Sequence, residues 1–98
     1  MPKAVLVLHR KRRFDDGAIS EMKLWLVPGP VRGSGHLFRY SLFYGRVGQR
    51  LIAYDNEPGN GDHRHYGHHE KPYEFTTPEK LVADFLPDVR AARRARQQ

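Results

Sequence analysis

Residues 36–47 read His36-Leu37-Phe38-Arg39-Tyr40-Ser41-Leu42-Phe43-Tyr44-Gly45-Arg46-Val47, and this stretch decides the fold. Phe38, Tyr40, Leu42 and Tyr44 occupy every second position, and such alternation is typical of a β-strand that buries one face. Because Leu37 and Phe43 add apolar side chains to the other face, we expect this strand to lie in the middle of a sheet.

Three further strands are expected around this central one. Residues 17–27 alternate with period two, and the Asp-Gly pair at 16–17 is a strong signal for a hairpin. This hairpin joins the strand at 17–27 to a strand at about 3–14, which begins with an apolar, β-branched run. A turn near Gly48 leads to a fourth strand at about 50–55. The intervening residues 28–35 are rich in Pro and Gly and predict a loop.

The C-terminal part predicts one helix at about 78–96. Thr77-Pro78-Glu79 supplies an N-cap hydroxyl, a proline at the first helical position and an acid in the first turn. Apolar residues then recur at helical spacing, and Pro87 is expected to kink or split the helix. The prediction is therefore one α+β domain over residues 1–98, a four-stranded antiparallel β-meander packed with one C-terminal helix. One helix covers one sheet face, which leaves the other face for a partner, with a homodimer as one option.

The charge distribution favours a polyanionic partner. The net charge is +6, and residues 1–50 hold ten Lys and Arg but three acids. A basic domain attracts nucleic acid, although solubility alone explains such a charge equally well. The absence of cysteine excludes disulfides and thiolate zinc sites and fits a reducing cytoplasm. The apolar run at residues 4–8 is too short for a signal or membrane segment, so we expect a cytoplasmic protein without membrane contact.

Residues 56–72 are polar, rich in glycine and without periodicity, so we expect a functional loop here. The loop contains Gly61-Asp62-His63-Arg64-His65, and four of the six histidines of the chain fall within residues 63–69. Histidine both accepts and donates protons near neutral pH, and it is the commonest neutral metal ligand. The sequence has no comparable concentration of reactive groups elsewhere.

One interpretation of the loop is metal-independent RNA cleavage, which needs a base, an acid and a cation near the phosphate. In an extended segment alternate residues project to the same side, so two imidazoles two positions apart can act together. No cofactor is required. The candidate catalytic residues are His63 and His65 as base and acid, Asp62 to orient one imidazole, Lys71 or Arg64 as the cation, and Tyr73 as a reserve proton donor.

Two other interpretations of the loop remain open. His63, His65 and Asp62 are an acceptable ligand set for zinc or manganese, which would make the protein a metal-dependent phosphodiesterase. The loop can also be solvated and without chemistry, and the protein is then a non-catalytic basic module that binds nucleic acid or another protein. The candidate nucleic-acid contacts are Arg10, Lys11, Arg12, Arg13 and Arg39.

The chain resembles the TumE-type family, small toxins of bacterial toxin–antitoxin pairs. The resemblance extends over nearly the whole length, and its most specific part is the Gly-Asp-His-Arg-His string. It is supported by Tyr40-Ser41-Leu42, Pro72-Tyr73-Glu74-Phe75 and Asp84-Phe85. The chain departs from the family pattern at Asn60, where lysine is usual. The resemblance implies a growth-arresting toxin whose partner is a helix-turn-helix antitoxin encoded next to it. RNA as the target and its cleavage are inferred from the residue chemistry.

Overall fold

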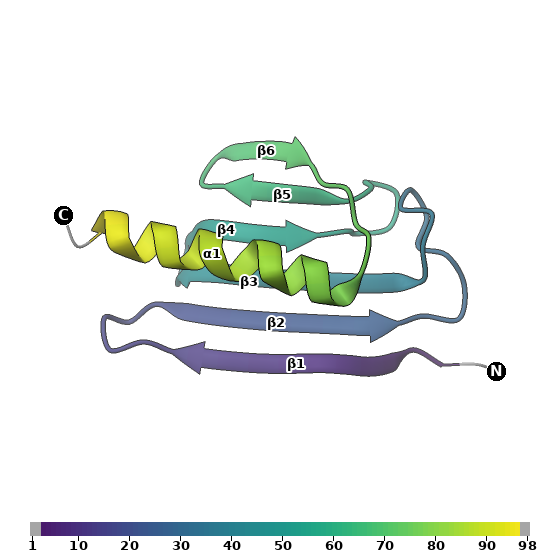
Figure 1. Ribbon diagram of the computed structural model, residues 1–98, viewed down its shortest axis with the longest axis horizontal. Helices are drawn as coiled ribbons and strands as arrows, with labels where there is room; N and C mark the ends of the chain where they lie inside the picture. Colours follow the sequence, from purple (N-terminus) through teal and green to yellow (C-terminus); the bar gives the residue numbers. More distant parts are fainter. Residues whose placement is uncertain (1–2, 97–98) are drawn as a thin grey trace.

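The computed structural model describes residues 3–96 and consists of one antiparallel sheet and one helix (Figure 1). Six strands pair in chain order, each with the next. The elements are β1 (Val5–Arg13), β2 (Ile19–Leu26), β3 (Phe38–Arg46), β4 (Gln49–Asp55), β5 (His63–Tyr66), β6 (His69–Pro72) and α1 (Pro78–Arg96). The α+β class, the antiparallel sheet and the C-terminal helix are confirmed, whereas the predicted number of four strands is wrong.

The additional two strands lie within the expected loop, residues 56–72. There β5 pairs with the free edge of β4, and β6 pairs with β5. Tyr66 and His69 are paired, so the turn between them has two residues. Its first residue, Gly67, has a φ of 60°, and no residue other than glycine has a positive φ among those described, which identifies a type II′ turn. The prediction failed because these short strands are polar and carry no apolar alternation. Backbone hydrogen bonding to an existing strand specifies them instead.

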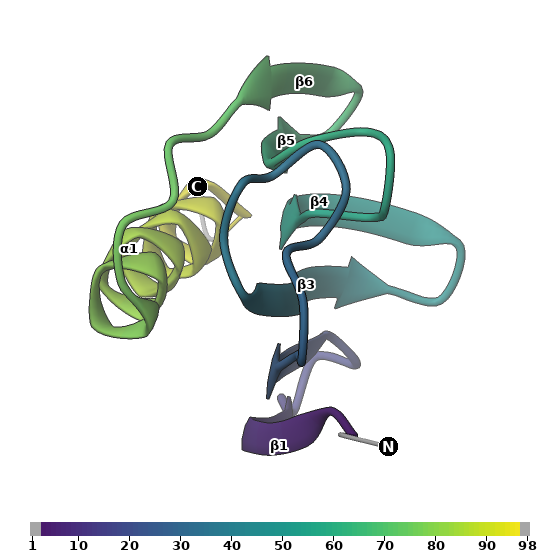
Figure 2. The ribbon, with the colours of Figure 1, turned by 90° about the vertical axis from the view of Figure 1, so that its right-hand side faces the viewer.

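One face of the sheet packs against α1 and forms the core. Leu81, Phe85 and Val89 are the buried residues of the helix. The ring of Phe85 meets the ring of Tyr54 edge-on, with centroids 6.0 Å apart. The sheet residues buried in this cluster are Ala18, Leu24, Tyr40, Leu42, Tyr44, Ile52 and Tyr54. In Figure 2 the helix lies on one side of the sheet and no helix lies on the other.

Two glycine-containing loops pack against each other at one end of the sheet, between β2 and β3 and between β4 and β5. The N–H of Gly59 donates to the carbonyl of Arg32 at 2.7 Å. A Cβ on Gly33, which has a φ of 91°, would lie 3.0 Å from the nitrogen of Gly61. Only glycine permits both this φ and this approach. The contact holds the chain in place just before it enters β5.

Pro87 lies inside α1, and Pro78–Arg96 is nevertheless one continuous helix. The expected split is therefore wrong. The helix tolerates the proline because Leu81, Phe85 and Val89 anchor it to the sheet on both sides of position 87. Among residues 3–96, no helix is both long and apolar enough to cross a bilayer.

We expect Pro87→Ala to stabilise the protein. The alanine restores a backbone N–H donor within the helix at an exposed position, and the gain is about 1–3 kcal/mol in free energy of unfolding. Chemical denaturation of both proteins measures the difference. A loss of stability would show that the proline makes a favourable contribution through the shape of the helix.

Candidate functional site

The sheet face that points away from α1, here called the open face, carries two rows of cross-strand neighbours. Residues that pair in register project to the same face. The first row is His9, Lys23, Ser41, Asp55, His63 and Pro72, and the second is Lys11, Glu21, Phe43, Ala53, His65 and Glu70. The expectation that His63 and His65 project to the same side is therefore met within β5.

Each of these two histidines lies close to a carboxylate from a neighbouring strand. His63 Nε2 lies 3.7 Å from Glu70 Oε1, and His65 Nε2 lies 3.4 Å from Asp55 Oδ2. The two pairs run diagonally across β5, because Asp55 is in register with His63 and Glu70 with His65. The side chain of His63 is 25% exposed and that of His65 is 9% exposed. Two imidazoles with adjacent carboxylates can exchange protons with a bound molecule, one accepting and one donating.

Arg64 and Lys71 lie on the opposite face of the sheet from His63 and His65. They pair with each other across β5 and β6, and Arg64 also pairs with Tyr54 in β4. The guanidinium of Arg64 lies 5.3 Å from the centre of the Tyr66 ring. The structure thus separates the two expected cations from the histidines by the thickness of the sheet.

Tyr73 belongs to a polar cluster between the sheet and α1. Its hydroxyl donates to Asp84 at 2.6 Å, and the Tyr66 hydroxyl donates to Asp88 at 3.0 Å. Burial and the hydrogen bond to Asp84 raise the pKa of Tyr73. Burial alone would raise the pKa of Asp84 as well, but hydrogen bonds from Lys80 and Tyr73 outweigh it and lower that pKa. This cluster fixes α1 to the sheet and keeps the Tyr73 proton in place.

Asp62 was expected to orient one imidazole of the loop, but in the structure it orients the imidazole of His36. The N–H of Phe38 donates to His36 Nδ1 at 3.1 Å, so His36 Nε2 carries the proton and donates to Asp62 Oδ2 at 2.7 Å. The Tyr40 hydroxyl donates to the same oxygen at 2.6 Å, and burial followed by this bond raises the pKa of Tyr40. Phe75 stacks on the His36 ring with centroids 4.2 Å apart. Asp62 therefore holds the start of β5 against the start of β3, immediately beside His63.

The three residues of the metal-dependent interpretation, His63, His65 and Asp62, are not grouped around one point. Within residues 3–96 no set of three or more His, Asp and Glu side chains is arranged to hold a metal ion. The imidazoles of His63 and His65 have Glu70 and Asp55 as neighbours, while Asp62 has His36 and Tyr40. The geometry does not fit a common metal centre for the three.

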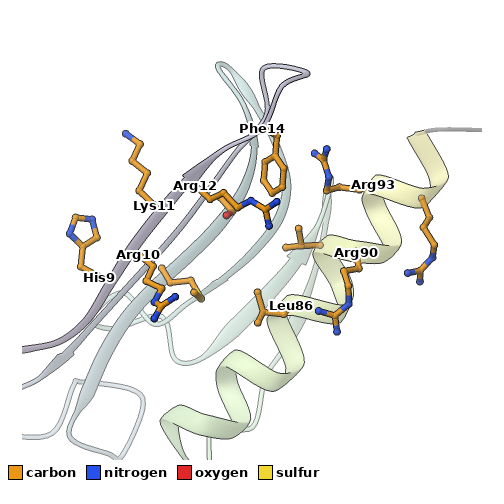
Figure 3. A pocket seen from close by; sticks show the side chains of 12 residues that line it. His9, Arg10, Lys11, Arg12, Phe14, Leu86, Arg90 and Arg93 are labelled. Atoms are coloured by element: carbon orange, nitrogen blue, oxygen red, sulfur yellow. The ribbon is translucent and has the colours of Figure 1, made fainter.

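The expected nucleic-acid contacts fall on two faces. In β1, Arg10 and Arg12 point toward α1, whereas His9 and Lys11 point away from it (Figure 3). The alternation places Arg13 with Lys11, and Arg39 is on the open face because it pairs with Trp25, two positions from Lys23. Lys11, Arg13 and Arg39 therefore share the face of the two histidines, together with the half-buried rings of Trp25 and Phe43.

Sequence reasoning missed Asp55, Glu70 and His36. Asp55 was taken as the end of a strand, and Glu70 as part of an irregular loop. A hairpin around Gly67 would have placed Glu70 opposite His65, so the overlooked signal was glycine at the first position of a two-residue turn. No local pattern connects His36 with Asp62, since 26 positions separate them.

Comparison with known proteins gives one family. The family model described as "Toxin TumE" matches residues 3–93, nearly the whole chain. No curated protein and no solved structure matches it.

Proposed function

The chain belongs to the TumE toxin family, and on this premise we propose that it is the toxin of a bacterial toxin–antitoxin pair and that it cleaves RNA on the open face of its sheet. The observation that supports the reaction is the side-by-side arrangement of the His63–Glu70 and His65–Asp55 pairs on a face that no helix covers.

The proposed reaction uses the 2′-hydroxyl of the RNA as the nucleophile. One imidazole accepts the proton of this hydroxyl while the oxygen attacks phosphorus, and the other imidazole donates a proton to the departing 5′ oxygen. The products are a 2′,3′-cyclic phosphate and a free 5′-hydroxyl, and the two histidines have exchanged protonation states. The carboxylates of Glu70 and Asp55 orient the rings and stabilise whichever is protonated, as in other histidine–carboxylate pairs.

The remainder of the open face is suited to single-stranded RNA. Trp25 and Phe43 offer aromatic rings on which bases can stack, and Lys11, Arg13 and Arg39 offer charge for the phosphates. Ser41 pairs with Asp55 of the site, and Arg39 lies two residues before Ser41 on the same strand. Arg39 is therefore diagonal to the His65–Asp55 pair on the open face. We assign it the stabilisation of the charged phosphorane that was expected of Arg64 or Lys71.

The partners follow from the same proposal. A toxin of this kind is held inactive by an antitoxin, which we expect to be encoded next to it and to carry a helix-turn-helix domain. Both proteins act in the cytoplasm, where the RNA target is found.

The proposal is tested by incubating the purified protein with total cellular RNA, with and without EDTA. We expect fragments ending in 2′,3′-cyclic phosphate under both conditions, together with growth arrest when the protein is expressed without its antitoxin. Activity that EDTA abolishes and Mn²⁺ or Zn²⁺ restores would replace this mechanism with a metal-dependent phosphodiesterase. Growth arrest with intact RNA under both conditions would overturn the ribonuclease proposal.

A non-catalytic nucleic-acid-binding module is the second candidate function, favoured by the cations and aromatic rings of the open face. Such a module binds RNA with an affinity that falls steeply with salt concentration, and it leaves the RNA intact. The two candidates differ in whether the histidines are needed for growth arrest.

A further inference from the structure

A groove runs between α1 and the β1–β2 pair (Figure 3). It lies on the sheet face that α1 packs against, opposite to His63 and His65. Its basic part, about 900 Å³, is lined by cations around an apolar floor that includes Phe14, Met22 and Val89. Its apolar part, about 490 Å³, is lined by Val7, Leu8, Leu24, Pro78 and Val82. The two parts share Arg10, Met22 and Leu86, so they form one continuous groove.

The groove exists because one helix cannot cover six strands. Strands lie about 4.8 Å apart, so six strands span roughly 24 Å, whereas a helix is about 10 Å wide. The helix α1 contacts β4 and lies over β3 and β4, which leaves the same face of β1 uncovered and that of β2 covered only in part, since Leu24 is buried (Figure 1). The uncovered width matches one additional helix beside α1. The side chains there are correspondingly exposed, with Val7 at 51% and Leu86 at 37%.

The basic part of the groove carries charge of one sign. From β1 and α1 it is lined by Arg10, Arg12, Arg90, Arg93 and Arg94 and by no carboxylate, whereas the apolar part includes Glu79. Asp16 pairs with Arg46, Arg93 and Arg96, and Glu21 pairs with His9 at the β1 edge. Among residues 3–96, Arg10, Arg12, Arg90 and Arg94 thus have no carboxylate partner. A binding partner that is acidic beside these side chains would supply one.

We propose that an acidic, amphipathic helix of the antitoxin docks in this groove. The inference rests on the toxin–antitoxin function proposed above but not on RNA cleavage. A helix with an apolar stripe and acids at one end satisfies both parts of the groove, whereas a sugar–phosphate chain would leave the apolar part uncovered. A second copy of this chain would bring its own α1, whose last turn carries Arg93, Arg94 and Arg96, and like charges would repel.

The test measures the affinity of the purified protein for the product of the adjacent gene, in wild type and in two variants of the groove. Leu86→Asp places an acid in the apolar floor, and Arg90→Glu reverses a charge in the basic part. We expect each to weaken binding by about 10–100-fold, since both positions lie within the docking surface. Val47→Asp, at a side chain that is 97% exposed, and Arg50→Glu are the matched controls and should change affinity less than about twofold.

Two further readouts separate the groove from the proposed RNA site. In cells, antitoxin co-expression should rescue growth from wild type but not from Leu86→Asp or Arg90→Glu, and both variants should still arrest growth alone. A 12-nucleotide oligouridylate should bind both variants as tightly as it binds Val47→Asp and Arg50→Glu. The proposal is overturned if the adjacent gene product does not bind, or binds the groove variants like their controls. A selective loss of oligouridylate binding, with antitoxin affinity unchanged, would instead make the groove a nucleic-acid site.

Discussion

Replacing His63 with alanine is expected to lower the rate of RNA cleavage by about 10²–10⁴-fold, the usual contribution of a general acid or base. His63 is the more accessible of the two histidines on the open face, so its loss removes one proton-transfer group with little effect on packing. His65→Asn should reduce the rate by a comparable factor. The measurement is the initial rate of cleavage of a labelled RNA, accompanied by a thermal unfolding curve for each variant.

The control for these changes is His69→Ala, in the same β-hairpin. His69 is exposed and pairs with Tyr66, which places it away from the open face, so cleavage should remain within about twofold of wild type. Glu70→Gln should have an intermediate effect, since it keeps the shape of the side chain but removes the charge beside His63. A His63→Ala variant that folds, cleaves RNA and arrests growth like wild type would contradict the assignment of the site.

Replacing Asn56 with alanine is expected to destabilise the protein by about 2–4 kcal/mol, or roughly 10–25 °C in Tm. Asn56 is fully buried and follows β4. Its side-chain oxygen accepts from the N–H of Tyr40 at 2.8 Å, and its amide nitrogen donates to the carbonyl of Phe38 at 2.7 Å. The side chain thus continues the β3–β4 pairing where the β4 backbone turns away. Removing it leaves two buried backbone groups without partners.

Asn60→Ala is the matched control for this prediction. Asn60 is exposed in the adjoining loop, where its backbone N–H donates to the carbonyl of Glu57 at 3.1 Å, and alanine keeps that bond. Its substitution should change the free energy of unfolding by less than about 0.5 kcal/mol. Urea denaturation compares the three proteins. Equal midpoints for Asn56→Ala and wild type would mean that water replaces the amide at no cost.

The local sequence pattern was sufficient to predict the strands and the helix that bury apolar side chains. The alternation of Tyr40, Leu42 and Tyr44 predicts the central strand, and the spacing of Leu81, Phe85 and Val89 predicts the helix. Both predictions hold because burial of an apolar face is the main driving force for these elements, and its period is visible in the chain itself. The family resemblance, which rests on the string around His63, is likewise confirmed by the match over residues 3–93.

The partners of the reactive groups were decided by tertiary structure alone. Asp62 is adjacent to His63 in sequence, yet its carboxylate accepts from His36 and Tyr40. Arg64 lies between His63 and His65 in sequence, yet the pleat of β5 directs it to the other face of the sheet. The strands β5 and β6 themselves form because β4 offers an edge with free N–H and C=O groups. Polar side chains with no apolar period leave no trace of such pairing in the sequence, since hydrogen bonding between backbones does not depend on side-chain identity. Chain composition and periodicity therefore determined the layers of this protein, while strand register determined which carboxylate meets which histidine.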